Sequence, residues 1–419
     1  MSTEVIFLGT GTSSSVPHIG MVVAQIGRQA LIKLADCITA HAIPGSSDRP
    51  PCKTCLSTID GTPEGKKNIR RNTSIIVRTP GKEGNVEAPY LSIAAKTFKV
   101  RIDALGICYP SQYVQAAALE WFPKYGLRRI DAGLLVHQHL NLFSLSVIPP
   151  VLITHAHSDA MNGLDDLRAW TLDTRIQSHI DIYVSEATFI EIKRAFPYLV
   201  SKEFASGGGD IPEFVWHVCM EDGVPFEVLD TSVMITPFLV NHGRLFTTPI
   251  ETIPAAGKSV EGSAPEIEQV ITPYMAMAFR IQQDFVYISD CGAIPDSAWP
   301  SISPSKDYQL PVCILDCLHL RSHPSHFGVE QAMIAARRIA AKRTYLLGFS
   351  HEIAHDEYVT LCEAVGGKTP QRSNLTENEV KGLSLIGEGE PIWVRPAHDG
   401  LRIQISRTDE RDVNDETYL

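Results

Sequence analysis

The segment at residues 154–160, Thr-His-Ala-His-Ser-Asp-Ala, carries residue types that bind metal ions. His155 and His157 stand two positions apart and Asp159 follows, directly after residues 151–154, whose apolar pattern is typical of a buried strand. Imidazole and carboxylate groups together suit zinc, manganese or iron. A divalent ion held at such a strand end can lower the pKa of a bound water towards neutrality and supply hydroxide. The alternative is a strand end with surface histidines. Further histidine and aspartate residues, in the order that a metal site needs, follow later in the chain and count against this alternative.

This segment resembles the metallo-β-lactamase superfamily, in which His-x-His-x-Asp-His is followed by a histidine, an aspartate and a histidine. The later positions fit residues 240–243, 287–292 and 348–351, each at a predicted strand end. The resemblance implies an αββα four-layer sandwich of the α/β class, with two divalent ions, zinc or manganese, at the active site. The ligands that it implies are His155, His157 and His242 for one ion, Asp159 and His351 for the second, and Asp290 as a bridge between them.

The chain departs from this pattern at one ligand and at one supporting residue. Ala160 stands where the motif usually has its last histidine, so water or a nearby carboxylate such as Asp165 would have to complete the second site. Asp165 and Asp166 also fit the start of a helix, where negative charge complements the helix dipole. Residues 91–98 lack the aspartate of an Ile-Asp-x-Gly motif, and loss of such a supporting residue weakens metal binding.

Five further segments indicate the branch of the superfamily: residues 7–14, 70–74, 163–168, 323–327 and 396–401. With them the chain, from residue 5 to residue 405, resembles the cyclic phosphodiesterase family of the carbon–phosphorus lyase pathway. This family is close to PQQ synthesis protein B, and the chain has the look of a fungal-type member. The first segment could also be a nucleotide-binding glycine loop, but no Gly-Lys-Ser/Thr follows it.

The cysteines suggest a second metal site. The chain has nine of them, an odd number that argues against a disulfide framework, and the pair Cys52 and Cys55 has the spacing of a metal or redox site. The resemblance implies a structural zinc held by Cys37, Cys52, Cys55 and His355, and a Cys₃His set is an ordinary structural zinc arrangement. A pair of free thiols is the alternative.

His326, in His-Pro-Ser-His-Phe at 323–327, is the candidate acid or phosphate contact. The resemblance places a histidine of this loop at the scissile phosphate, and histidine can protonate a leaving oxygen at neutral pH. A surface or helix-entry histidine is an equally weighted alternative, and His319 and His323 are weaker rivals. The basic residues at 66–67 and 70–71 could bind phosphate or simply form a solvated loop.

Three stretches interrupt the resemblance to this family and have no counterpart in its sequence pattern, namely residues 20–35, 100–115 and 133–150. The genetic code allows each to be a translated intron, and genuine loop insertions are the alternative, since surface loops tolerate added length. We expect a single domain over residues 1–405 and a polar tail over 406–419. The mixture of short strands and helices predicts sheet layers flanked by helices.

The charge and hydropathy of the chain restrict the kinds of molecule that it is expected to bind. The formal net charge is −11, which makes a nucleic-acid-coating surface unlikely, and no apolar run has the length of a membrane span. We expect a cytoplasmic protein, with the nucleus as an alternative, and a homodimer is left open.

The expected function is hydrolysis of a small phosphodiester, cyclic ones included, by a metal-bound hydroxide, with Asp159 orienting the nucleophile and His326 assisting the leaving group. An RNA 3′-processing nuclease or a thioester hydrolase on the same fold is the alternative among enzymes. A non-catalytic metal-binding protein is the alternative outside them.

Overall fold

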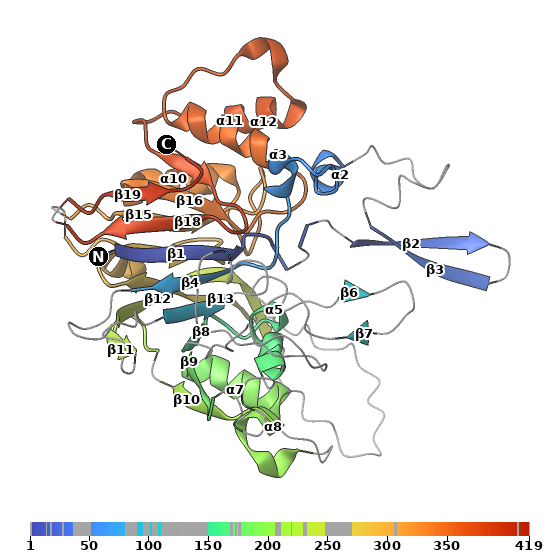
Figure 1. Ribbon diagram of the computed structural model, residues 1–419, viewed down its shortest axis with the longest axis vertical. Helices are drawn as coiled ribbons and strands as arrows, with labels where there is room; N and C mark the ends of the chain where they lie inside the picture. Colours follow the sequence, from blue (N-terminus) through green and yellow to red (C-terminus); the bar gives the residue numbers. More distant parts are fainter. Residues whose placement is uncertain are drawn as a thin grey trace, which may run out of the picture.

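The computed structural model describes residues 2–36, 52–79, 90–94, 150–247 and 270–418 apart from short gaps, together with 101–102, 108–109 and 124. Two large sheets form the body (Figure 1). The strands of the eight-stranded sheet are, in spatial order, β10 (Phe214–Val218), β9 (Ile180–Val184), β8 (Val151–Ile153), β5 (Tyr90–Ala94), β4 (Ser74–Arg78), β1 (Ser2–Gly9), β18 (Arg402–Ser406) and β19 (Val413–Asp415). Those of the seven-stranded sheet are β11 (Phe226–Val228), β12 (Val233–Thr247), β13 (Val270–Ile281), β14 (Phe285–Ile288), β15 (Val312–Asp316), β16 (Arg343–Leu347) and β17 (Val394–Pro396).

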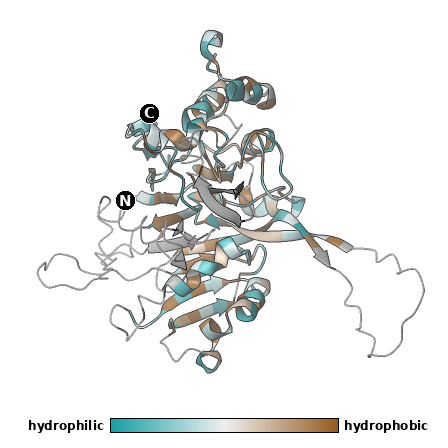
Figure 2. Cartoon of the chain, turned by 90° about the vertical axis from the view of Figure 1, so that its right-hand side faces the viewer, coloured by the Kyte–Doolittle hydropathy of each residue, from teal (hydrophilic) through white to brown (hydrophobic). Residues whose placement is uncertain are grey.

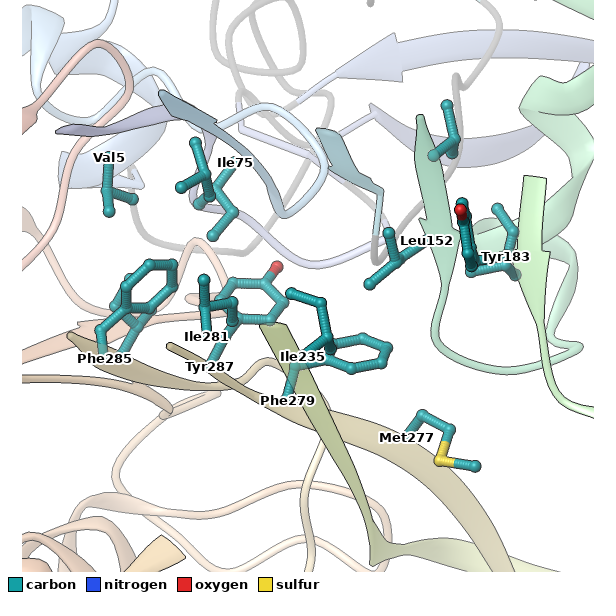
Figure 3. Close-up of a cluster of buried hydrophobic side chains, with 14 of the residues drawn as sticks. Val5, Ile75, Leu152, Tyr183, Ile235, Met277, Phe279, Ile281, Phe285 and Tyr287 are labelled. Atoms are coloured by element: carbon teal, nitrogen blue, oxygen red, sulfur yellow. The ribbon is translucent and has the colours of Figure 1, made fainter. Parts of the chain in front are cut away.

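The main hydrophobic core lies between these two sheets. Val5, Ile75 and Leu152 of the eight-stranded sheet belong to the same buried cluster as Phe279 and Tyr287 of the seven-stranded sheet, and Figure 3 shows the two sets facing one another. All five side chains are fully buried. Burial of this much apolar surface is the principal force that holds the sheets together.

Helices cover the outer face of the seven-stranded sheet. In α10 (Val329–Ile339) the apolar residues recur at helical spacing, and Ala332, Met333 and Ala336 pack in a second cluster with Val286 and Leu315 of the sheet. The same cluster includes residues of α11 (His355–Val365), which packs against α12 (Glu377–Leu385). These helices carry both hydrophobic and hydrophilic positions, as expected for elements with one buried side (Figure 2).

The remaining helices are short, apart from α7 (Glu186–Ala195), which packs against β10 through Phe189 and Trp216. Among the described residues these are α2 (Lys53–Ser57), α3 (Pro63–Lys66), α5 (Ser158–Met161), α8 (Pro197–Val200) and α9 (Trp299–Ile302). Two facing sheets with helices outside them confirm the predicted α/β fold class. Among the helices that the structure describes, none is long and apolar enough to cross a membrane.

The strand ends that carry the motifs share one edge of the body. β8 runs parallel to β5 and β9, and β14, β15, β16 and β17 are all parallel. In parallel sheets, ligands bind outside the carboxyl ends of the strands. Met277 of β13 donates its backbone N–H to the carbonyl of Thr154 at the end of β8 (2.8 Å), which joins the two sheets at this edge.

Two segments outside the expected catalytic body have regular structure. Residues 19–36 form a hairpin of β2 (Ile19–Ile26) and β3 (Gln29–Asp36) that pairs with neither large sheet (Figure 1). Part of the expected polar tail forms β19, which pairs with β18. Two short strands, β6 (Arg101–Ile102) and β7 (Cys108–Tyr109), lie within the second suspected insertion, and most of the third lies outside the described residues.

Candidate metal centre

Three histidines from the two sheets meet at one point. His155 and His157 follow β8, and His242 lies in β12 where its pairing with β13 shifts register between Asn241 and Arg244. Such a bulge bends a strand and redirects its side chains. One ring nitrogen from each histidine lies within 4.8 Å of the others, and His157 Nδ1 is 3.1 Å from His242 Nε2. Three converging imidazoles are the donor set of a divalent metal site.

Neighbouring groups fix the orientation of two of these rings. His155 Nδ1 lies 2.8 Å from the hydroxyl oxygen of Thr154, and His242 Nδ1 donates to the carbonyl of Ser325 at 2.8 Å. Each bond leaves the Nε2 of its ring for the cluster. Metal-binding histidines almost always have such a partner on their other nitrogen. The outer hydrogen bonds therefore fit a metal centre as well as the inner nitrogens do.

Tyr274 of β13 supports the third ring, and no sequence motif pointed to it. Its ring stacks on His157 with the centroids 4.3 Å apart and the planes 10° from parallel. Its hydroxyl oxygen accepts the backbone N–H of Ala156 at 3.1 Å, and partial burial raises the pKa of the phenol. Tyr274 thus packs against the turn that carries both histidines of the first motif.

Asp290 and His326 border the same cluster. Asp290 follows β14 and is buried, its Oδ1 is 4.0 Å from His242 Nε2, and Ser289 Oγ donates to its Oδ2 at 2.8 Å. Ligand atoms of His242, Asp290 and His326 lie within 4.8 Å of one another. The structure therefore brings together five of the predicted site residues: His155, His157, His242, Asp290 and His326.

Asp316, the last residue of β15, is a site neighbour that sequence reasoning missed. It is fully buried, and its Oδ2 accepts a hydrogen bond from His326 Nδ1 at 2.8 Å. A single aspartate at the end of an apolar run has no motif around it, so the sequence contains no signal that could have identified it. His319 and His323, the weaker rivals, lie in the same loop. Of these three histidines, His326 is the one that the described contacts place both at Asp316 and in a ligand group with His242 and Asp290.

The second predicted ion has fewer described ligands than expected. Asp159 lies in the first turn of α5 and close enough to Tyr274 to affect its pKa, but it belongs to none of the three-residue ligand groups found among the described residues. Ala160 is buried and offers no donor atom. Asp165 falls in a short 3₁₀ segment, Asn162–Leu167, directly after α5.

His351 lies with the cysteines, which corrects its predicted place. Its Nδ1 is 3.4 Å from Cys52 Sγ and 3.7 Å from Cys55 Sγ, and the three residues form a ligand group of their own. Hydrogen bonding with Cys55 and the nearby His351 lower the pKa of Cys52 to about 4, although partial burial opposes the shift. A thiolate of this kind is the form of cysteine that binds zinc. Cys37 lies outside the described residues.

His355, the predicted zinc ligand, has a different environment. It is the first residue of α11, it is buried, and its Nε2 lies 2.8 Å from the hydroxyl of Tyr418 in the tail. Burial, with His398 nearby, lowers the pKa of His355 well below its ordinary value. The spacing of 351 and 355 did not show which histidine faces the cysteines, because both lie within eight residues of the end of β16.

The arginines of the predicted basic loop have structural partners. Arg70 is buried and donates to the carbonyls of Ser350 and Ile353, on either side of His351. Arg71 pairs with the buried carboxylate of Asp399. Arg70 thus holds the loop that presents His351 to the cysteines.

Comparisons with known proteins agree with this architecture. The family described as Beta-lactamase superfamily domain matches residues 108–349, more than half of the chain. Among solved structures, a diphosphatase of the PhnP family covers 97% of its own length and 96% of this chain, at 18% identity and a TM-score of 0.52. The metallo-β-lactamase fold protein YhfI of Bacillus subtilis covers 100% and 96%, at 11% identity and a TM-score of 0.46. No curated protein matches the sequence. The family match, together with the fold and the histidine cluster, shows that the chain belongs to the β-lactamase superfamily of metallo-hydrolase folds.

Proposed function

We propose that this protein is a metal-dependent phosphodiesterase that hydrolyses a small phosphodiester. The observation that carries the proposal is the convergence of His155, His157 and His242 with Asp290, next to His326, at the carboxyl ends of the strands. Three imidazoles and one carboxylate are a fitting donor set for zinc or manganese. His326 borders these donors and could contact a substrate phosphate held there.

The cation and the side chains would have separate tasks. A divalent ion supplies Lewis-acid chemistry, because it makes a water molecule more acidic and stabilises negative charge on phosphate oxygens. His155, His157, His242 and Asp290 would hold the ion. His326 would donate a hydrogen bond to the phosphate or the leaving oxygen. Asp159, on the first turn of α5, is the candidate for orienting the water.

The number of ions is part of the proposal. We assign one ion to the three-histidine cluster, and a second, if bound, would depend on Asp159 and Asp290 because His351 lies with the cysteines. A structural zinc would be held by Cys52, Cys55 and His351, with Cys37 as the remaining candidate ligand. The two metal sites would then have different chemistry, one rich in sulfur and one without it.

The substrate class follows from charge. The net charge of −11 disfavours binding to the phosphate backbone of a long nucleic acid, since such binding is driven largely by basic residues. A small diester needs only local neutralisation by the cation and by His326. We therefore place the substrate among small, including cyclic, phosphodiesters.

Hydrolysis of bis(p-nitrophenyl) phosphate by the metal-loaded protein tests the proposal. We expect turnover that is abolished by chelation and by His242→Ala, and that is retained by His217→Gln, a control histidine paired with Asp181 on the outer strands. Cleavage of a precursor RNA or a thioester without turnover of the diester would assign the alternative hydrolase functions. Bound metal with no turnover of any of these substrates would contradict an enzymatic role.

A further inference from the structure

The carboxylate of Asp316 stands directly behind His326. It is fully buried, and it is the last residue of β15. Its Oδ2 accepts from His326 Nδ1 at 2.8 Å and also from the backbone N–H of Cys291 at 3.0 Å. Since Cys291 follows Asp290, one oxygen atom fixes both the phosphate-facing histidine and the chain at a candidate metal ligand.

The geometry decides which nitrogen of His326 carries its proton. An ionised carboxylate has no hydrogen to donate, so with Asp316 ionised the 2.8 Å between Nδ1 and Oδ2 assigns the proton to Nδ1. Nε2 is then left without a proton, and the ring of His242 lies 4.9 Å away between centroids. In a free neutral imidazole the proton favours Nε2, so the protein reverses the ordinary preference here.

The loop that carries His326 is held at both ends. Leu318 N–H donates to the carbonyl of Phe327 at 2.9 Å, and Val329 N–H donates to that of His319 at 3.0 Å. The carbonyl of Ser325, next to His326, accepts from His242 Nδ1. The His326 ring therefore has little freedom to turn, and its direction depends on the bond at Nδ1.

Gly348 makes room for the second oxygen of Asp316. A Cβ at this position would lie 2.4 Å from Asp316 Oδ1, and φ of +84° is a conformation that favours glycine. The carboxylate is thus enclosed by the chain after β14, the loop of His326 and the turn after β16. These three segments converge on a group that none of the motifs contains.

We propose that Asp316 is a positioning residue, which sets the tautomer and the direction of His326 so that Nε2 faces the substrate phosphate. This proposal rests on the proposed function for its catalytic consequence, although the position of the proton can be measured without a substrate. Partners of this kind typically contribute about 10- to 100-fold to activity. The effect should appear in kcat rather than in metal content, because Asp316 contacts no atom of the three-histidine cluster among the contacts that the structure describes.

The experiment combines kinetics with ¹⁵N NMR of the histidine side chains. The His326 signals are assigned by their loss in His326→Gln. In the wild-type protein they should show the Nδ1–H form, in Asp316→Ala they should move towards Nε2–H, and in Asp316→Asn the change should be smaller because the amide oxygen can still accept. We expect kcat to fall about 10- to 100-fold in Asp316→Ala, with metal content retained and a partial recovery in Asp316→Asn.

Asp284→Asn is the matched control, because Asp284 is also a buried carboxylate. It directly precedes β14, whereas the candidate metal ligand Asp290 follows the other end of this strand. It should leave the His326 signals and kcat unchanged. A tautomer that Asp316→Ala does not alter would overturn the proposal. Loss of metal from that variant would also overturn it, since Asp316 would then act on the metal site through Asp290 or His326 and not on the tautomer alone. If the wild-type protein turns over no phosphodiester, the proposed function fails and the tautomer measurement alone decides the role of Asp316.

Discussion

At the scale of single residues, the structure separates two candidate metal sites by their donor atoms. His242 belongs to a cluster of nitrogen and oxygen ligands, whereas His351 lies against two sulfur atoms. Cobalt distinguishes such sites, because only thiolate ligands give a sulfur-to-cobalt charge-transfer absorption. We predict that His351→Ala removes this absorption and reduces the hydrolytic activity less than His242→Ala does. His242→Ala should abolish the activity and leave the absorption unchanged.

His179→Ala provides a control, since His179 is a half-exposed residue beside Asp181. It should change neither signal. If the absorption survives in His351→Ala and vanishes in His242→Ala, His351 is a ligand of the active-site metal, as the sequence motif predicts.

The first motif could be predicted from sequence because its residues are close together in the chain and end a recognisable strand. His155 and His157 are such residues, and the glycine-flanked His242 fits the same pattern. Asp316 and Tyr274 could not be predicted, since each acts through one contact across the fold. In the structure His351 lies beside Cys52 and Cys55, and His355 lies beside Tyr418, because side-chain direction depends on packing, which spacing does not encode.

At the scale of elements, the β2–β3 hairpin is the best candidate for removal. Ile19 and Asp36 are directly paired across it, so deletion of residues 20–35 joins two positions that already lie side by side. The hairpin pairs with neither large sheet. We predict that the deletion changes the free energy of unfolding by less than about 1 kcal/mol, measured by urea titration, since loop length has a small entropic effect.

Deletion of residues 411–419, which include β19, is the comparison and should be strongly destabilising. A hairpin deletion that destabilises the protein as much as the loss of β19 would show that residues 20–35 are an integral part of the fold. Sequencing of the transcript would test the intron hypothesis independently.

The C-terminal segment is more ordered than its polar composition indicated. The buried carboxylate of Asp415 in β19 accepts from Arg343 at 2.8 Å and from the hydroxyl of Tyr345 at 2.7 Å. Composition missed this, because a strand that pairs along one edge needs few apolar residues. We predict that Asp415→Ala lowers the free energy of unfolding by about 3–5 kcal/mol, as breaking a buried pair does.

Asp356→Ala is the matched control. Asp356 pairs with Lys53 on the surface, at 2.9 Å and with both side chains more than half exposed. Its loss should cost less than about 1 kcal/mol. Equal effects of the two substitutions in denaturant titrations would show that Asp415 is not held as described.

At the scale of the whole molecule, two buried histidines make stability depend on pH. Burial lowers the pKa of His398 to about 4 and that of His355 well below its ordinary value. Below pH 6.5 the unfolded chain takes up protons that the folded chain cannot. The stabilisation is therefore complete above about pH 6.5 and is lost as the pH falls towards 4, by roughly 1.4 kcal/mol per pH unit for each histidine.

Denaturant titrations at pH 7 and pH 5 measure this dependence. His398→Gln should reduce the difference between the two pH values, whereas His179→Gln, at a half-exposed position, should not. An unchanged pH dependence in His398→Gln would show that other groups govern acid unfolding.

The sandwich itself was predictable because its strands have continuous apolar runs and its motifs stand at strand ends. What the sequence could not provide was the set of contacts between the two sheets, such as that of His157 with His242, which are 85 positions apart in the chain. These contacts depend on the register of β12 against β13 and on its shift beside His242. They are a property of the assembled molecule.

Anomalous X-ray diffraction from crystals of the zinc- or manganese-loaded protein tests the central claim most directly. We predict an anomalous peak at about 2.0–2.2 Å from nitrogen atoms of His155, His157 and His242 and from an oxygen atom of Asp290. Absence of a peak among these four side chains, in a crystal whose cysteine site is loaded, would contradict the account of this protein as a metallo-hydrolase.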